Sequence, residues 1–320
     1  MEKVILSNSN LEVSRLCFGG DQMGGYGWGT VFPNELFLAV NKAIDLGINF
    51  FDTADIYGLG ESEKFLGMAL GNRRKNVVLA TKFGVRKTNE GVTYYDNSPE
   101  WIREALFNSL QRLKTDYIDL YQLHYRDSVT PIEEIIKTLE QLKNDGYIRY
   151  YGLSNIFMKN YEELLPFKGK FVSFQDEYSL ANRTHENDMN LLSKSFCMTP
   201  LTWGSLGQGI LTGKYDSTVK FDENDRRSRQ IYKNFHGEKL IKNLEIVDEM
   251  KKISQIYKKS IPSIALRFIL DYLQGSVVIV GIKNLSQLTT NIESLDWALE
   301  PKHLQILETI SRDKTEERND

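Results

Sequence analysis

The stretch FDTADIYGLGESE, residues 51–63, joins the end of one short apolar run to the start of a segment with helical periodicity. The apolar run Ile48–Phe51 has the length of a strand, and Glu61–Leu70 spaces its apolar residues as a helix does. Gly58 and Gly60 permit a tight turn between the two segments. The stretch therefore predicts one β-strand that leads through a turn into one α-helix.

The same strand-and-helix unit recurs along the chain. Further segments with helical periodicity begin at proline, with Asn34 and Ser98 in cap-like positions; they are Pro33–Leu46, Pro99–Leu113 and Pro131–Asn144. Runs that are apolar almost throughout are typical of parallel strands buried on both faces. The eight apolar runs are Arg15–Phe18, Ile48–Phe51, Val77–Thr81, Tyr117–Leu123, Ile148–Leu153, Phe171–Phe174, Met198–Thr202 and Val277–Val280. Their number and spacing predict an α/β fold, a closed (β/α)8 TIM barrel.

Three segments add to this repeating pattern. KVILSNSNLEV, before the first strand, predicts a short N-terminal β-hairpin that closes the bottom of the barrel. The long interval before the last strand holds the polar stretch KFDENDRRSRQ and predicts two extra helices, Glu238–Tyr257 and Pro262–Leu273. No linker divides the chain, so we expect residues 1–320 to form a single domain, with a flexible tail over about 311–320.

An open doubly wound sheet is the competing fold, because it uses the same strand-and-helix units. Its dinucleotide-binding fingerprint is missing. FGGDQMGGYGWG, residues 18–29, is rich in glycine, but its spacing differs from G-x-G-x-x-G and no helix begins within it. The stretch is better explained as a loop over the mouth of a barrel.

Composition limits the classes of partner. The net charge of -3 with dispersed basic residues gives no sign of a surface for nucleic acid or an anionic membrane, so we expect a small-molecule substrate. The N-terminal residues lack a signal core and no apolar run could span a bilayer, which predicts a cytoplasmic protein. Cys17 and Cys197 lie in apolar segments without metal-type spacing, which predicts buried, reduced thiols and no metal site. The sequence does not distinguish a monomer from a homo-oligomer.

Polar residues follow the apolar runs at the ends where a βα barrel builds its active site. Each one alone has an ordinary explanation as a cap, a turn or a satisfied core residue. Their convergence at one mouth is the informative observation; the residues are Asp52, Lys82, His124, Ser154, Asn155 and Gln175.

A carboxylate, an ammonium group, a phenol and an imidazole at one mouth can form a proton-transfer device. Lys82 beside Tyr57 would lower the pKa of the phenol, and Asp52 would hold the lysine charged and oriented. His124 would hydrogen-bond the same reacting oxygen. Tyr57 could then protonate an alkoxide as a hydride reaches the adjacent carbon.

The stretch FDTADIYGLGESEKFLG resembles the signature of the aldo-keto reductase superfamily. It is followed in order by LATKF, YIDLYQLH, YYGLSN, FQDEYSL, LTWGSLGQGILTGKY and VGIKNLSQLTTNI, so the resemblance covers nearly the entire chain and is closest to the bacterial and potassium-channel beta-subunit-like branches. It implies a catalytic tetrad of Asp52, Tyr57, Lys82 and His124. It also implies a reversible hydride transfer between a nicotinamide cofactor and a carbonyl or alcohol, such as an aldehyde, a ketone or a sugar or cyclitol derivative.

The resemblance also implies the cofactor site. Trp203 would stack on the nicotinamide and Lys283 would meet a 2'-phosphate, although a solvated lysine explains that position too. NADP(H) is favoured and NAD(H) remains an alternative, because a lysine lacks the bidentate fork of arginine. The implied residues are Gly20, Asp21, Asp52, Ser154, Asn155, Gln175, Trp203, Gly204, Ser205, Leu206, Gly209, Leu211, Lys214, Gly281, Ile282, Lys283, Gln287 and Asn291.

The expected wall of the substrate pocket is aromatic and partly polar, formed by Tyr26, Trp28, Ile56, Phe83, Tyr125 and Arg126. Arg126 suggests an anionic or polyhydroxylated substrate, and a surface salt bridge explains it equally well. A regulatory subunit that binds cofactor with little turnover is the alternative function. The presence of His124 favours the enzyme, because channel-associated relatives tend to lose that histidine.

Overall fold

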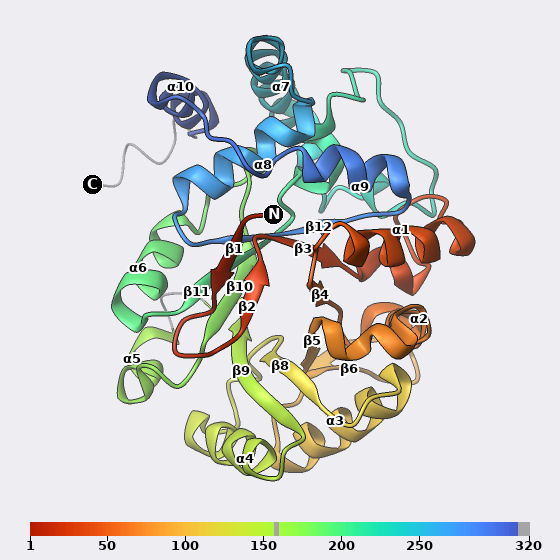
Figure 1. Ribbon diagram of the computed structural model, residues 1–320, viewed down its shortest axis with the longest axis vertical. Coiled ribbons are helices and arrows are strands. Elements are labelled where there is room, and N and C mark those ends of the chain that lie inside the picture. Colours follow the sequence, from red (N-terminus) through yellow and green to blue (C-terminus); the bar gives the residue numbers. More distant parts are fainter. Residues whose placement is uncertain (157–159, 313–320) are drawn as a thin grey trace.

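The computed structural model describes residues 1–156 and 160–312, and its centre is a closed barrel of eight parallel strands (Figure 1). Neighbouring strands follow the order β10-β11-β12-β3-β4-β5-β8-β9 around the barrel. The strands are β3 (Leu16–Gly19), β4 (Phe50–Asp52), β5 (Val78–Phe83), β8 (Ile118–Leu123), β9 (Ile148–Ser154), β10 (Ser173–Glu177), β11 (Thr199–Trp203) and β12 (Val277–Gly281). This arrangement confirms the (β/α)8 barrel.

The N-terminal hairpin is also confirmed. Strand β1 (Lys3–Ile5) pairs antiparallel with β2 (Glu12–Ser14). Leu6, Leu11 and Val13 of this segment are almost fully buried in one apolar cluster with residues that point into the barrel, such as Cys17 and Leu201. The hairpin therefore closes the bottom of the barrel with apolar side chains.

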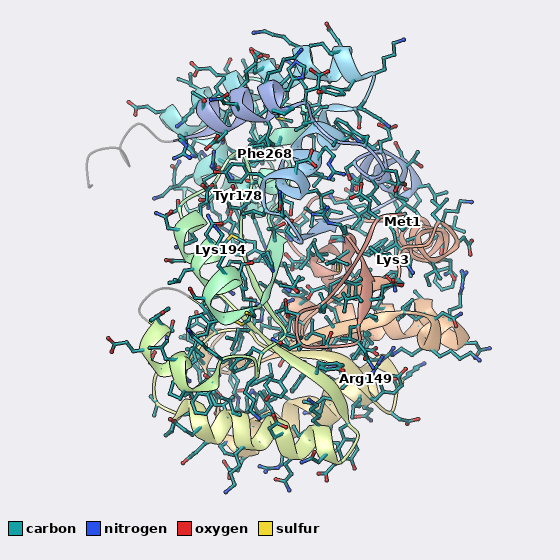
Figure 2. All side chains as sticks on the ribbon, turned by 60° about the vertical axis from the view of Figure 1, so that its left-hand side comes forward. Met1, Lys3, Arg149, Tyr178, Lys194 and Phe268 are labelled. Carbon is teal, nitrogen blue, oxygen red and sulfur yellow. The ribbon has the colours of Figure 1, made fainter. Side chains whose placement is uncertain are left out.

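Helices surround the barrel, as Figure 1 shows. They are α1 (Pro33–Asp45), α2 (Glu61–Leu70), α3 (Pro99–Leu113), α4 (Ile132–Asn144), α5 (Tyr161–Leu164), α6 (Glu186–Phe196), α7 (Gly237–Tyr257), α8 (Ile261–Tyr272), α9 (Leu285–Ile292) and α10 (Pro301–Ser311). The two extra helices predicted before the last strand are α7 and α8. Tyr178 and Phe268, labelled in Figure 2, are fully buried where the helices meet the barrel.

Several local expectations need correction. The Ser98 hydroxyl accepts a hydrogen bond from the amide of Trp101 and so caps α3, but Asn34 lies inside α1, whose cap position is Phe32. Cys17 is buried as expected, whereas Cys197 is exposed, because it ends α6 in a left-handed conformation with φ 54°. Residue 311 is the last residue of α10 rather than the start of a tail, and 313–320 lie outside the described residues.

One element was not predicted from the sequence. After β5 the chain forms an antiparallel hairpin of β6 (Val85–Lys87) and β7 (Thr93–Tyr95) at the rim of the barrel. All three residues of β7 are exposed and Val85 alone is buried on β6, so the hairpin has too little buried surface to produce a hydrophobic pattern. Within the described residues, no helix is long and apolar enough to cross a membrane.

Candidate active site

Four titratable side chains meet at the end of the barrel where the strands finish. Asp52 is the last residue of β4, Lys82 lies near the end of β5, and His124 directly follows β8. Tyr57 opens the short 3-10 helix η2 (Tyr57–Gly60), which leads from β4 into α2. The structure therefore brings together the four residues that we expected to form a catalytic tetrad.

Lys82 is the centre of this group. Its ammonium donates to Asp52 Oδ2 at 2.7 Å, to the carbonyl oxygen of Thr53 at 2.9 Å and to the hydroxyl of Tyr57 at 3.3 Å. The residue is completely buried. A buried ammonium is costly unless it is paired and hydrogen-bonded, and these three acceptors meet that requirement. The contacts fix the ammonium beside the phenol.

Two glutamine amides hold the other oxygen of Asp52. Gln122 Nε2 donates to Asp52 Oδ1 at 3.1 Å, and Gln175 Nε2 donates to the same atom at 2.9 Å. Gln122 is completely buried on β8 and was not among the expected site residues. It lies inside an apolar run two residues before His124, so only its polarity could have drawn attention to it. Asp52 is thus fixed by Lys82 on one side and by two amides on the other.

The pKa of Tyr57 runs opposite to our expectation. Burial of the phenol, together with the negative charges of Asp52 and Asp21, raises its pKa well above the ordinary value of 10.0. The positive charge of Lys82 does not reverse this rise, because its ammonium lies closer to Asp52 than to Tyr57 and the carboxylate offsets much of its charge. The phenol is therefore held in its protonated form, which can donate a proton.

His124 is held neutral. Burial, together with the positive charge of Lys82, lowers the pKa of the imidazole well below the ordinary value of 6.5. The ring packs edge-on against Tyr57, with the two centroids 6.0 Å apart, and its Nδ1 has no hydrogen-bond partner among the described residues. A neutral imidazole next to the phenol can donate one hydrogen bond to a reacting oxygen without itself supplying the proton.

Three polar residues expected at the cofactor site lie beside the tetrad: Ser154 ends β9, Asn155 follows it, and Gln175 lies on β10. Ser154 Oγ donates to the carbonyl oxygen of Gln175 at 2.9 Å, and Asn155 Nδ2 donates to that of His124 at 3.1 Å. Asn155 adopts a left-handed conformation with φ 52°. Gln175 lies in the middle of β10 rather than at its end, and its amide nitrogen contacts Asp52. These side chains therefore also support the loops and the carboxylate of the tetrad.

The loop after β11 turns back on itself at successive glycines. Trp203, the last residue of β11, leads into Gly204 (φ 65°), Gly207 (φ 56°) and Gly209 (φ 105°). Left-handed residues in such loops turn backbone N–H groups toward a common concavity, which suits a phosphate. Ser205 and Leu211 are buried beneath this loop, whereas Leu206 and Lys214 are partly or fully exposed.

Cations gather where this loop approaches α9. Burial, followed by the positive charges of Arg227 and Lys214, lowers the pKa of Lys283. Arg227 is held by Asp225, to which its Nη2 donates at 2.6 Å, and by the hydroxyl of Tyr215 at 2.7 Å. Side-chain cations that repel one another in this way form a site that favours binding of an anion such as a phosphate. Arg227 was not singled out, because its position in the polar insertion gave no sign of where the loop would fold.

The remaining residues expected to contact cofactor lie around α9 and the first loop. Gln287 Oε1 accepts a hydrogen bond from the amide of Lys283 at 2.9 Å, and Asn291 is buried on the same helix. Ile282 is buried, whereas Gly281 is exposed at the end of β12. The amide of Gly20 donates to the carbonyl oxygen of Asp52 at 2.8 Å.

The glycine-rich first loop, residues 18–29, is hydrogen-bonded across the barrel mouth to the polar insertion KFDENDRRSRQ. Trp28 Nε1 donates to Asp21 Oδ2 at 2.6 Å, and Arg226 Nη1 donates to the same oxygen at 3.3 Å. The Tyr26 hydroxyl accepts a hydrogen bond from Arg229 at 2.7 Å, and the ammonium of Lys283 donates to the carbonyl oxygen of Trp28. Two loops far apart in the sequence thus meet over one side of the barrel mouth.

Two residues of the expected substrate pocket lie elsewhere. Phe83 is completely buried and packs against Tyr121, with the ring centroids 4.6 Å apart, because its side chain points from β5 toward the helices. All five donor hydrogens of Arg126 are used by Glu163, Asp127, Asn97 and Thr130. Arg126 therefore belongs to an ion-pair network, not to a free anion-binding position.

The other expected pocket residues lie at the rim. Ile56 precedes Tyr57, and Tyr125 stacks on His124 with the ring centroids 5.1 Å apart. Tyr95 of the unexpected hairpin stacks on the other side of Tyr125, at 5.0 Å. The hairpin thus contributes an aromatic side chain next to the tetrad. Among the described residues, no group of His, Cys, Asp and Glu is placed to hold a metal ion.

Comparison with known proteins identifies what the chain resembles. Residues 15–312 match the sequence profile of the Aldo/keto reductase family. The chain is 32% identical over 315 residues to the aldo-keto reductase YhdN of Bacillus subtilis, covering 97% of this chain and 93% of that protein. It is 30% identical over 311 residues to the NADH-specific methylglyoxal reductase of Escherichia coli, covering 92% of this chain and 94% of that protein.

A solved structure is similar to this chain over nearly its whole length. The glycerol dehydrogenase AKR11B4 of Gluconobacter oxydans superposes with a TM-score of 0.86 at 29% sequence identity. The superposition covers 96% of this chain and 94% of that one.

Proposed function

The chain belongs to the aldo/keto reductase family and is therefore an oxidoreductase of carbonyls and alcohols, and we propose that it transfers a hydride between NAD(P)H and a carbonyl substrate with Tyr57 as the general acid. The observation that carries this proposal is the contact between a buried, fully paired Lys82 and the hydroxyl of Tyr57, 3.3 Å apart, beside a neutral His124.

Each residue of the tetrad has a separate task. When bound, the reduced nicotinamide supplies the hydride. Tyr57 gives its hydroxyl proton to the carbonyl oxygen of the substrate, and its raised pKa keeps that proton available at neutral pH. Lys82 stabilises the negative charge that develops on the phenol, and Asp52 keeps Lys82 in place. His124 donates a hydrogen bond to the same carbonyl oxygen and orients it.

The proposal is tested by replacing the phenol hydroxyl. Tyr57→Phe keeps the ring against His124 but removes the proton donor, so we expect the turnover number kcat to fall by about 10²–10⁴-fold. The assay follows the consumption of NADPH or NADH with a panel of small aldehydes, ketones and hydroxy compounds, in both directions. The names of the similar methylglyoxal reductase and glycerol dehydrogenase support starting this panel with small, oxygen-rich compounds.

Tyr150→Phe is a matched control, because the hydroxyl of Tyr150 donates to Asn10 of the N-terminal segment, at the end of the barrel opposite to the tetrad. It should retain most of the wild-type kcat. Full activity in Tyr57→Phe would contradict the proposed role. Cofactor binding without turnover in the wild-type protein would instead point to a regulatory subunit.

We further propose that NADP(H) is favoured over NAD(H). The cluster of Lys283, Arg227 and Lys214 supports this preference, since a 2'-phosphate would relieve the repulsion among the cations. Asp225 weakens the preference, because its carboxylate lies within the same cluster.

Lys283→Met measures the preference. Loss of one charged contact to phosphate is expected to lower kcat/KM for NADPH by about 10- to 100-fold, and to leave kcat/KM for NADH within about threefold of the wild-type value. A fall of equal size for both cofactors would show that Lys283 has only a structural role, because NADH carries no 2'-phosphate.

A further inference from the structure

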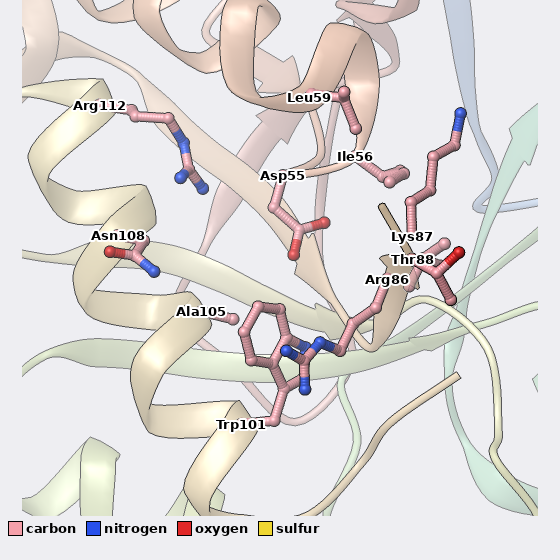
Figure 3. A pocket seen from close by; sticks show the side chains of 11 residues that line it. Asp55, Ile56, Leu59, Arg86, Lys87, Thr88, Trp101, Ala105, Asn108 and Arg112 are labelled. Atoms are coloured by element: carbon pink, nitrogen blue, oxygen red, sulfur yellow. The ribbon is translucent and has the colours of Figure 1, made fainter. Parts of the chain in front are cut away.

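A cavity outside the tetrad opens on the outer flank of the barrel, between η2, β6 and α3 (Figure 3). Its volume is about 310 Å³, which lies at the small end of the range for ligand pockets. None of Asp52, Tyr57, Lys82 and His124 lines it. The side chains that give it chemical character are Asp55, Arg86, Lys87, Trp101, Asn108 and Arg112.

Two buried polar atoms at this cavity lack a hydrogen-bond partner among the described residues. They are Nε1 of Trp101, on α3, and Oδ1 of Asp55, in the turn before Tyr57. Figure 3 shows the carboxyl group of Asp55 pointing toward the indole ring. Buried polar groups are nearly always hydrogen-bonded in folded proteins, so we expect each of these two atoms to meet a water molecule or a ligand in the cavity.

The carboxyl group of Asp55 is protonated at neutral pH. Burial, together with the negative charge of Glu63, raises its pKa to about 8, although Arg112 opposes this shift. The neutral acid can donate a hydrogen bond, as the indole N–H of Trp101 can. The cavity therefore offers two donors close to each other and no fixed negative charge at neutral pH.

Basic side chains add to this donor character. The guanidinium of Arg86 lies over the ring of Trp101, 3.9 Å from its centroid, and pairs with Asp96 at 2.7 Å. Arg112 pairs with the buried Glu63 through its Nε at 2.6 Å and donates from Nη2 to the hydroxyl of Ser109 at 3.3 Å, so among the described residues its Nη1 remains for another acceptor. Lys87 is exposed at the edge of the cavity.

The rest of the lining is apolar. Ile56 and Leu59, from the turn that carries Tyr57, lie on one side, and Ala105 of α3 lies on the other. A ligand for this cavity must combine a compact group of acceptors with a small apolar body. A single negative charge on the acceptors would match the basic side chains.

We propose that this cavity is a second ligand site, separate from the tetrad, which binds a small organic carboxylate between Trp101, Asp55 and Arg112. The carboxylate oxygens accept the hydrogen bonds of the indole N–H and of the Asp55 hydroxyl. The apolar body of the ligand packs against Ile56 and Leu59.

The four tryptophans of the chain make the test specific. Each gives one indole N–H signal in an ¹H–¹⁵N correlation spectrum, and the signal of Trp101 is assigned by its loss in Trp101→Phe. Trp28 and Trp203 report on the barrel mouth, whereas Trp297, whose Nε1 donates to the carbonyl oxygen of Glu293 at 2.7 Å, is a distant reference. The probe is sodium benzoate, and benzamide is its neutral counterpart of the same shape.

Benzoate at neutral pH is expected to shift the Trp101 signal along a saturable curve, with a Kd of about 1 mM or lower. Benzamide should bind at least about 10-fold more weakly, because it lacks the charge. Lys87→Gln should weaken benzoate binding about two- to fivefold without disturbing the fold, since Lys87 is exposed. The Trp297 signal should not move.

Three results would overturn the proposal. They are a Trp101 signal that stays fixed throughout the titration, a Trp101 signal that follows benzamide as closely as benzoate, and a benzoate titration that moves only the signals of Trp28 and Trp203. The last result would assign carboxylate binding to the barrel mouth. The titration needs no turnover, so it stands independently of the proposed reductase activity.

A bound carboxylate would contact the residues on both sides of Tyr57, because Ile56 and Leu59 line the cavity. The next expectation rests on the proposed function. Benzoate should change kcat without competing with the carbonyl substrate. Trp101→Phe should remove that effect and keep the basal kcat. Purely competitive inhibition that persists in Trp101→Phe would contradict this coupling. Whether benzoate binds in the cavity would then be decided by the spectra alone.

Discussion

At the residue scale, two deeply buried titratable side chains of the barrel strands differ in whether a partner of opposite charge lies beside them. Lys82 is completely buried, and Asp52, the Thr53 carbonyl and Tyr57 accept three hydrogen bonds from its side-chain nitrogen. Asp176, on the outward face of β10, is almost as deeply buried but has no such cation among the residues that the structure describes. Burial, together with the charge of Asp188, raises its pKa to about 7, and the amides of Asn155 and Ile156 only partly oppose the shift.

Asp176 should therefore make the stability of the protein fall as pH rises. Its pKa is raised on folding from 3.8 to about 7, so the folded state keeps a proton that the unfolded chain loses first. Stability linked to this group is fully present below about pH 4 and is lost as pH rises toward 7. Asp176→Asn should stabilise the protein at pH 8 by on the order of 3 kcal/mol and have little effect at pH 4, as measured by urea unfolding.

The control is Asp248→Asn, which removes an exposed carboxylate of α7 that pairs with Lys251. Such a surface pair contributes little, so its free energy of unfolding should change by less than about 1 kcal/mol at either pH. A stabilisation by Asp176→Asn of equal size at pH 4 and pH 8 would show that the carboxyl group does not titrate as described.

Sequence patterns identified most residues that meet at the barrel mouth, because a polar residue at the end of an apolar run is visible without coordinates. Asp52, Lys82 and His124 all have that signature. Gln122 and Arg227 do not: one is a polar residue inside an apolar run, and the other lies in a polar insertion. The predicted direction of the Tyr57 pKa was also wrong, because burial of the phenol and the negative charges of Asp52 and Asp21 outweigh the effect of Lys82, and none of these is visible without coordinates.

At the scale of elements, the turn that carries Tyr57 is held by its contact with the first loop. Gly24 ends the 3-10 helix η1 (Asp21–Gly24), and a Cβ atom built on Gly24 would lie 2.7 Å from the amide nitrogen of Gly58. Gly58 itself has φ 58°, and Leu59 beside it has φ 53°, which is a left-handed conformation that a leucine rarely adopts. The position of Tyr57 thus depends on two loops that touch through glycines.

Gly24→Ala should displace the Tyr57 turn, because the added methyl group meets backbone atoms that cannot rotate away. We expect kcat/KM for carbonyl reduction to fall by about 10- to 100-fold while the protein remains folded. Gly25→Ala is the matched control: it changes the next residue, where a Cβ atom would meet nothing within 4 Å, and costs only the strain of a left-handed alanine, about 1 kcal/mol. Equal activity losses in the two variants would rule out the contact as the cause.

The elements themselves were predicted as far as they bury apolar surface. The eight barrel strands are largely buried on both faces, and their apolar runs marked their ends to within about three residues. The β6–β7 hairpin exposes β7 completely and is held instead by stacking, as between Tyr95 and Tyr125. Hydrophobic periodicity cannot reveal such an element, which explains why one aromatic side chain of the rim was missed.

At the scale of the whole molecule, the two ends of the barrel have different tasks. The tetrad and its loops occupy the end where the strands finish, whereas the N-terminal hairpin seals the other end with Leu6, Leu11 and Val13. In βα barrels the first end carries the chemistry and the second contributes stability. Stability and activity should therefore be separable by substitutions at the bottom of the barrel.

Leu11→Ala tests this division. Leu11 is 1% exposed, so its truncation leaves a cavity beneath the barrel and should lower the free energy of unfolding by about 2–5 kcal/mol. Since the change lies at the end opposite to the tetrad, kcat/KM should stay within about twofold of the wild-type value at a temperature where both proteins are folded. Ile5→Ala on the same hairpin is the control, because Ile5 is 60% exposed and its loss should cost about 0.5 kcal/mol or less. If folded Leu11→Ala lost most of its kcat/KM, packing at the bottom of the barrel would have to reach the tetrad through the strands, and the division between the two ends would be wrong.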